Sequence, residues 1–352
     1  MKKHNRRNVI LAIAGVLCIL GIFYFAIWKG EQIWRSASLK DAAENENTGE
    51  MDRLLWKDIE LNKKKYRYSR DFETYLVIGT DASGNEAADR EEYIGNMADF
   101  LLLAVINRTD GTYAFLQLNR DTMTEVSLLD NEGRGRATAE IQLCTAHWYG
   151  GTPEESCENT VKAVSDMLGG ISIEGYYAIN MSEISRLNHA VGGVTVTIED
   201  DFSNIDETLK KGETITLNDE QAVNFVRSRM GMENDDNTAR MARQRQYLNA
   251  LLEKVQEKTA DDPEFALGLY DELSDVSDTN MSGGLISDLL IDMSEAESKG
   301  ILSLEGETKL GKHLGDGLEH AEFYLDKSAI VNTMKLLYNI EENEQIKTER
   351  KN

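Results

Sequence analysis

The chain has 352 residues and carries 62 aspartates and glutamates against 38 lysines and arginines, a formal net charge of −24. This acidity argues against a nucleic-acid partner, because phosphates would be repelled over most of the surface. The length beyond the N-terminal segment suffices for one large domain or two small ones. Strand and helix patterns continue without an evident internal repeat and with only 2 prolines, which favours one domain.

The N-terminal segment has the pattern of a membrane anchor. Residues 1–7 carry four basic side chains, and residues 8–28 contain an uncharged run of twenty residues from Val9 to Trp28. At ~1.5 Å per residue, such a helix spans a hydrocarbon core of ~30 Å. We expect a cytoplasmic basic tail over 1–7 and an uncleaved transmembrane helix over 8–28. The basic flank predicts a single-pass protein of the cell membrane with its main domain extracellular.

Three segments are expected after this helix. Residues 29–70 are polar, favour helix and hold few candidates for a core, which predicts an extracellular stalk. Strands and helices mix over residues 71–340, the expected folded domain. Residues 341–352 are expected to form a polar tail.

Three buried strands are predicted early in the domain. Thr74 to Gly79 forms the first and is followed by Asp81. Phe100 to Ile106 and Tyr113 to Leu118 form the next two, and the Asp110-Gly111 pair between them is typical of a turn. The last two strands therefore form a hairpin.

Charged residues gather at one end of this hairpin. Asp99 precedes its first strand and Arg120 follows its second, so they should meet. A single aspartate after a strand, such as Asp81, is usually a turn former or helix cap. Two aspartates at neighbouring strand ends beside arginines instead fit a hard divalent cation, because Mg²⁺ takes few carboxylates and adds water and phosphate oxygens. Asp121 is interpreted as orienting a basic neighbour.

Two cysteines of the predicted domain leave a question open. Cys144 and Cys157 flank a turn at residues 150–153, between two helical segments that could lie antiparallel. An extracellular location permits a disulfide between them. Two buried thiols are the alternative, since spacing alone does not show whether the β-carbons approach.

A dense group of arginines lies further along this acidic chain. Its members are Arg227, Arg229, Arg240, Arg243 and Arg245. Guanidinium groups match phosphate oxygens two at a time, so the group indicates an anionic ligand. A solvated helix face paired with the acidic residues between 233 and 236 is the alternative.

Helical spacing favours the ligand. One helix stripe contains Arg240, Arg243, Gln244, Tyr247, Leu248, Leu251 and Val255. Its lower half is apolar and points inward, so the arginines at the helix start point inward too, where the helix dipole disfavours cations. Asn218 and Gln221 form a plausible capping box for a preceding helix that ends at Arg227. Two helix ends therefore bring basic groups to one place, whereas Arg245 lies off the stripe and should tolerate substitution.

Several short motifs occur in an order that resembles the LytR-CpsA-Psr (LCP) family. They span about Thr74 to Val255 and comprise Gly79-Thr80-Asp81, Asp99, Asn119-Arg120-Asp121-Thr122, Gly192-Gly193-Val194-Thr195-Val196, Val226-Arg227-Ser228-Arg229 and Arg240-x-x-Arg243-Gln244. The resemblance implies an α/β fold in three α/β/α layers around a mixed central sheet. It also implies metal-assisted transfer of a polyprenyl-pyrophosphate-linked glycopolymer onto a peptidoglycan acceptor at the membrane.

The resemblance implies roles for individual residues. Asp81 and Asp99 correspond to magnesium ligands. The residues that would clamp the pyrophosphate and carry catalysis are Arg120, Arg227, Arg229, Arg240 and Gln244, with Arg243 supporting them. Magnesium and the arginines would compensate the charge of the leaving polyprenyl phosphate while a sugar hydroxyl attacks.

The chain also departs from the family pattern. Met97-Ala98-Asp99 stands where Arg-Ser-Asp is usual, and Asn237 begins the segment that usually reads Asp-x-Gly-Arg. Arg90 is a candidate to replace the missing arginine. Two alternatives to the transferase follow: an exported hydrolase that cleaves the lipid pyrophosphate with water, and a non-catalytic binder of the lipid-linked polymer.

Overall fold

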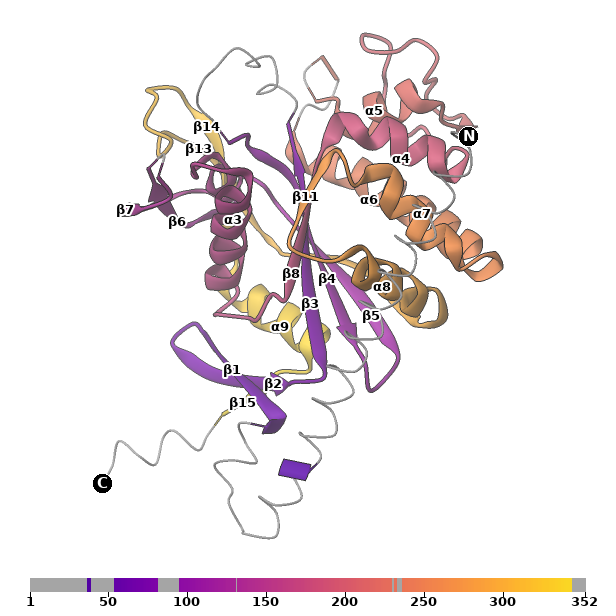
Figure 1. Ribbon diagram of the computed structural model, residues 1–352. Helices are drawn as coiled ribbons and strands as arrows, with labels where there is room; N and C mark the ends of the chain where they lie inside the picture. The colour runs from indigo at the N-terminus through magenta and orange to yellow at the C-terminus, as the bar shows by residue number, and fades with distance from the viewer. Residues whose placement is uncertain are drawn as a thin grey trace, which may run out of the picture.

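The structure is a computed structural model that describes residues 37–38, 54–81, 95–130, 132–229, 231–232 and 236–343. The predicted cytoplasmic tail, the transmembrane helix, most of the stalk and Arg90 lie outside these ranges. Within them, no helix combines the length and apolar character needed to cross a membrane. The strands and helices, labelled as in Figure 1, are β1 (Trp56–Leu61), β2 (Lys64–Ser69), β3 (Phe72–Thr80), β4 (Ala98–Asn107), β5 (Thr112–Leu118), β6 (Met123–Leu129), β7 (Gly135–Gln142), η2 (Leu143–Trp148), α3 (Pro153–Met167), β8 (Gly175–Asn180), η3 (Met181–Glu183), α4 (Ile184–Val191), β9 (Thr195–Thr197), β10 (Thr214–Thr216), α5 (Asp219–Arg227), α6 (Asn237–Asp261), α7 (Glu264–Leu273), β11 (Ser277–Thr279), α8 (Gly283–Glu295), β12 (Glu297–Ser303), β13 (Gly306–Gly311), β14 (His320–Leu325), α9 (Lys327–Tyr338) and β15 (Glu341–Glu342).

A mixed six-stranded sheet forms the centre of the molecule, in the order β11-β8-β3-β4-β5-β12. The predicted hairpin is present as the antiparallel pair β4 and β5, and β3 pairs antiparallel with β4. β3 also pairs parallel with β8, and β12 pairs parallel with β5. The three strands predicted early in the domain are therefore confirmed as the middle of the sheet.

Helices cover both faces of this sheet, as the layered prediction requires (Figure 1). Helices α3 and α9 lie on one face, and α6 and α8 lie on the other. The core under α3 and α9 includes Leu101 and Leu103, whereas Leu102 and Ile106 pack with residues of α8. Successive side chains of a strand point to opposite faces, so β4 contributes to both cores.

The predicted start of the helix that ends at Arg227 is formed as expected, and a second cap, which the sequence analysis did not include, begins α6. Asn218 accepts a hydrogen bond from the backbone of Gln221, whose side chain bonds back to the Asn218 backbone, so the capping box of α5 is complete. The Asp236 side chain caps α6 by accepting from the Ala239 N–H. Because both caps satisfy backbone groups that a helix start leaves unpaired, they fix where each helix begins.

The boundaries of the folded domain are wider than the sequence patterns indicated. The predicted stalk to residue 70 is wrong over its last part, because β1 and β2 form an antiparallel hairpin whose Ile59, Leu61, Tyr66 and Tyr68 are buried in the core. The start of the predicted tail is also ordered, since β15 pairs with β2. Charged residues, among them Lys57, Lys64 and Lys65, interrupt the buried positions and hid the alternation.

Candidate active site

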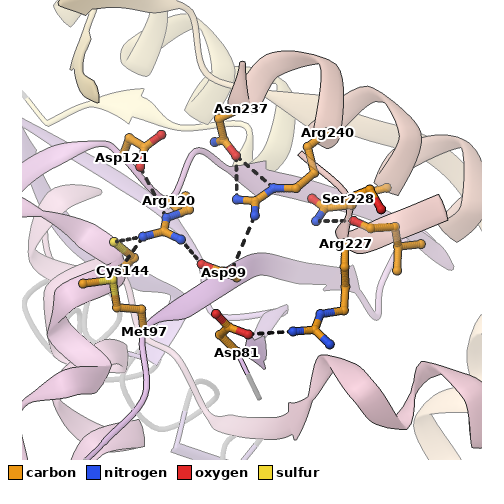
Figure 2. Close-up of polar contacts among 12 residues, drawn as sticks. Asp81, Met97, Asp99, Arg120, Asp121, Cys144, Arg227, Ser228, Asn237 and Arg240 are labelled. Carbon is orange, nitrogen blue, oxygen red and sulfur yellow. Dashed lines mark hydrogen bonds and ion pairs between the residues drawn. The ribbon is translucent and has the colours of Figure 1, made fainter. Parts of the chain in front are cut away.

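Asp81 and Asp99 lie together at one end of the central sheet (Figure 2). β3 and β4 are paired up to Gly79 and Phe100, and a register shift follows there. The Asp81 N–H still donates to the Met97 carbonyl at 3.2 Å. The side chain of Asp99 is 12% exposed and that of Asp81 is 35% exposed, so the pair is reached from solvent on the Asp81 side.

Arg120 joins this pair from the turn after β5, as the sequence predicts. Its guanidinium forms ion pairs with Asp99 and, from Nε at 3.3 Å, with Asp121 Oδ1. Its Nη2 lies 3.1 Å from both Met97 Sδ and Cys144 Sγ. The predicted orienting role of Asp121 fits its ion pair, and Met97 contacts the guanidinium at the place where the family pattern has an arginine.

Arg227 and Arg240 approach from α5 and α6 (Figure 2). Arg227 Nη2 lies 2.6 Å from Asp81 Oδ1, and Arg240 Nη1 lies 3.4 Å from Asp99 Oδ2. Arg240 is buried and also donates from Nε and Nη2 to Asn237 Oδ1 at 3.2 and 2.7 Å. Asn237 therefore orients the Arg240 fork, which is a function that an amide performs as well as the aspartate usual in the family pattern.

Arg229 lies just beyond α5 and is partly exposed. No carboxylate within the described ranges lies at ion-pair distance from it. It lines a pocket together with Arg120 and Asp121. The other three arginines of this group each contact an aspartate, so Arg229 differs from them in lining the pocket without an ion pair to a described carboxylate.

The electrostatics of the group favour an incoming anion. Four arginines, Arg120, Arg227, Arg229 and Arg240, stand against three aspartates, Asp81, Asp99 and Asp121. Burial lowers the pKa of Arg240, although Asp99 acts in the opposite direction. Burial likewise raises the pKa of Asp121, although Arg120 opposes this. The group therefore has one positive charge in excess, and burial destabilises any of its charges that lacks a partner. A bound phosphate would stabilise the group because it supplies negative charge to the arginines.

Three predicted residues have other surroundings than expected. Arg243 faces the end of α5, where it donates to the Phe225 and Ser228 carbonyls and pairs with Asp200 at 2.5 Å. It therefore supports the end of α5 that carries Arg227, as the family resemblance implies, and its part in catalysis stays a prediction. A cation at the carbonyl end of a helix is favourable both as a hydrogen-bond donor and for the helix dipole.

Gln244 and Arg245 form a network with a residue that the sequence did not single out. Gln117 of β5 donates to Gln244 Oε1 at 3.1 Å and accepts from Arg245 Nη1 at 2.8 Å. Gln244 also donates to the Val226 carbonyl at 3.3 Å. Arg245 is thus not a free surface residue. Its substitution would remove the hydrogen bond to Gln117, which the expectation of tolerance did not take into account.

The two cysteines of the domain are free thiols, so the disulfide alternative is wrong. Cys144 contacts Arg120, whereas Cys157 lies 3.6 Å from His147 Nε2. Burial raises the pKa of the Cys144 thiol to about 11 and that of Cys157 to about 12. Both sulfurs are therefore protonated and inert at neutral pH.

An apolar cavity of about 320 Å³ opens between the sheet and the helices of the α6 face. β4 lines it with Phe100, Leu102 and Ala104, and β5 lines it with Phe115. Gly79, Val226 and Gln244 also line it. Gly79 lies two residues before Asp81 and Val226 directly precedes Arg227, so the cavity lies beside the charged group.

The donor set of Asp81 and Asp99 is compatible with magnesium. Both are oxygen donors on neighbouring strands, and both side chains lie on the same side of the β3 and β4 ends (Figure 2). Within the described ranges, no cluster of three or more metal-binding side chains occurs. Two carboxylates nevertheless suffice for Mg²⁺, which keeps several waters and binds substrate phosphates.

Comparisons with known proteins agree with this geometry. The TagU of Halalkalibacterium halodurans, a polyisoprenyl-teichoic acid–peptidoglycan teichoic acid transferase, is 26% identical over 246 residues, which are 69% of this chain and 72% of TagU. Biofilm regulatory protein A of Streptococcus mutans is 28% identical over 207 residues, which are 56% of this chain but only 46% of that protein.

Solved structures share the fold. TagT bound to LI-WTA superposes with a TM-score of 0.56 at 23% identity, over 77% of this chain and 90% of TagT. A Streptococcus agalactiae protein superposes with a TM-score of 0.60 at 22% identity, over 78% of this chain and 90% of that chain. The sequence model of the LytR_cpsA_psr family matches residues 35–348. The chain therefore belongs to the LytR_cpsA_psr family, as its motifs indicated.

Proposed function

We propose that this protein is a membrane-anchored, extracellular transferase that moves a polyprenyl-pyrophosphate-linked glycopolymer onto peptidoglycan. The observation that carries the proposal is the convergence of four arginines and two aspartates beside an apolar cavity that Gly79, Phe100 and Val226 line. A lipid pyrophosphate has both parts that this arrangement matches, an anionic head and an apolar tail. TagU and TagT, named above, make teichoic acid the polymer class that we expect.

Asp81 and Asp99 would hold magnesium in this proposal. When bound, Mg²⁺ would neutralise part of the pyrophosphate charge. The pyrophosphate oxygens would replace the aspartate oxygens as partners of Arg227 and Arg240, whose forks already point to this place. Because these donors are positioned before the substrate arrives, little reorganisation opposes the charge that develops on the leaving polyprenyl phosphate.

The supporting residues would keep the arginines in place during the reaction. Asn237 holds the Arg240 fork through two hydrogen bonds, and Asp121 holds Arg120. Arg243 ties the end of α5 to Asp200 and so fixes the origin of Arg227. The apolar cavity would exclude water from the lipid side, which strengthens the electrostatic contacts beside it.

The test compares two buried arginines of the same helix, Arg240 and Arg243. Arg240→Lys keeps the charge but loses the fork, so it should weaken binding of a polyprenyl pyrophosphate analogue about tenfold to a hundredfold. Arg243→Lys should lower the unfolding temperature and change that affinity much less. Asp99→Asn should remove the dependence of transfer on magnesium. Binding is measured by titration, and transfer by the appearance of polymer on peptidoglycan fragments.

The same assay separates the alternatives. Release of polyprenyl phosphate without modified peptidoglycan would identify a hydrolase, and binding without any release would identify a non-catalytic binder, which the missing arginine at Met97 would then explain. Equal losses of affinity in Arg240→Lys and Arg243→Lys would show that the fork of Arg240 does not contact the pyrophosphate.

A further inference from the structure

A second pocket, of about 240 Å³, is lined by both charged and apolar residues, Arg120 among them. Arg120, Asp121 and Arg229 line one part of it, and Leu314, His320 and Ala321 of the β13–β14 hairpin line another. The apolar cavity shares none of these residues. The two spaces differ in their linings: the apolar cavity has no charged side chain, whereas the second pocket has Arg120, Asp121 and Arg229.

Backbone contacts fix the hairpin over the pocket. The Phe323 N–H donates to the Asp121 carbonyl at 2.8 Å, and Thr122 and Phe323 form a parallel bridge. Gln142 Nε2 donates to the Ala321 carbonyl at 3.2 Å. His320 directly precedes Ala321. The backbone contacts of residues 321 and 323 therefore fix the position of His320 in the pocket that Arg120 and Arg229 line.

The imidazole of His320 is oriented by a carboxylate. His320 Nε2 lies 2.8 Å from Asp316 Oδ2, and Asp316 Oδ1 accepts from the Leu318 N–H at 2.9 Å. These contacts keep the pKa of Asp316 low, the Leu318 N–H first and the His320 contact after it. Hydrogen bonding of Nε2–H to this carboxylate leaves Nδ1 with its lone pair, the arrangement of a base held in one tautomer.

We propose that this second pocket, with its charged lining, receives the acceptor sugar and that His320 is the general base for its hydroxyl, with Asp316 as a positioning residue. This role rests on the proposed transferase function. His320 Nδ1 would take the hydroxyl proton while the hydroxyl oxygen forms a bond to the phosphorus that carries the polymer. The bond from that phosphorus to the bridging oxygen breaks, and its electron pair leaves with polyprenyl phosphate. The proton then passes from the imidazolium to solvent.

Other groups at the pocket are less suited to this role. Asp121 is engaged by Arg120, and Cys144 is a protonated thiol. The charged and titratable groups that face His320 are Asp316 of its own hairpin, Arg120 and Asp121 after β5, Arg229 after α5, and Cys144 of η2.

The hairpin provides a matched control. His313 also pairs with a carboxylate, with Nδ1 2.9 Å from Glu322 Oε1, but it does not line the pocket. The experiment uses the full-length protein in detergent, a lipid-linked polymer donor and peptidoglycan fragments. Transfer is measured between about pH 5 and pH 9, where histidines titrate. Titration with a polyprenyl pyrophosphate analogue measures donor binding in each variant.

His320→Gln should slow transfer about 10²- to 10⁴-fold and remove the fall of the rate at acid pH. Donor affinity should stay within about twofold, because the base contacts the acceptor and not the pyrophosphate. Asp316→Asn should slow transfer less and move the acid limb of the profile, whereas His313→Gln should leave both measurements unchanged.

Other results would overturn the proposal. An unchanged acid limb in His320→Gln would exclude the base, and a parallel loss of donor affinity would make His320 a cation that binds phosphate. If His313→Gln slowed transfer as much as His320→Gln does, both substitutions would act by disturbing the β13–β14 hairpin and not by removing a base. Absence of transfer by the wild-type protein would instead contradict the proposed function itself, and this role with it.

Discussion

The two faces of the central sheet share their strands but differ in how they are filled. Under α3 and α9, the side chains of Leu101, Leu103 and Leu116 are 0% exposed. On the opposite face, the neighbouring residues Leu102 and Phe115 line the cavity of about 320 Å³. Successive side chains of a strand point to opposite faces of the sheet. The same strand can therefore fill the core on one face and border a ligand cavity on the other.

Truncation should show the largest difference between the faces. Leu103→Ala should lower the free energy of unfolding by ~2–5 kcal/mol, because a close-packed site cannot collapse around the lost atoms. Leu102→Ala should cost less than half as much, since Leu102 already borders a cavity. Denaturant unfolding of both variants measures the difference. Equal losses would mean that the cavity is filled in the free protein.

Replacing a small residue by a large one should also distinguish the two faces, with a smaller change in stability than truncation. Ala114 packs in the filled core, and Ala104, its near neighbour across the β4–β5 pair, lines the cavity. Ala114→Phe should destabilise by ~1–3 kcal/mol through overpacking. Ala104→Phe should leave the unfolding temperature nearly unchanged but reduce binding of a polyprenyl pyrophosphate analogue. Retained lipid affinity in Ala104→Phe would place the lipid tail elsewhere.

Thiol labelling gives the smallest effect and tests only how tightly the region around α3 and η2 is packed. Cys157 lies in the filled core and Cys144 beside Arg120, and burial raises the pKa of both, to about 12 and about 11. Both should resist an alkylating reagent at neutral pH until the protein unfolds, as measured by mass spectrometry. Rapid native labelling of Cys157 would contradict a close-packed face. Failure of both to label in denaturant without reductant would reveal a disulfide.

Much of the fold follows from local patterns. The apolar runs of β3, β4 and β5 and the caps of α5 and α6 are set by neighbouring residues, which the sequence shows directly. The β1–β2 hairpin was missed because lysines interrupt its apolar residues. Its signal is alternation, with Ile59 and Leu61 before a two-residue turn at Asn62 and Lys63, both at positive φ.

The sequence predicts the parts of the site that lie at the ends of paired strands. It does not predict contacts between residues that are far apart in the sequence. The approach of Asp81, Asp99 and Arg120 follows from the pairing of β3, β4 and β5. Helical phase correctly turned Arg243 inward, but phase does not say which inward group it meets, and it meets the end of α5. His320 lies 200 residues beyond Arg120, so only the docking of β14 on residues 121 and 122 reveals it.

The pairing of β15 with β2 brings the last strand of the domain close to its first strand. β2 lies between β1 and β15, and the Asn343 N–H donates to the Lys65 carbonyl at 2.9 Å. With strands ~4.8 Å apart, the first and last strands of the domain are separated by the width of a single strand between them. The first and last strands of the domain thus form the two edges of the same small sheet. A short peptide could join the two ends into a circle, and anything attached to one end is held beside the other.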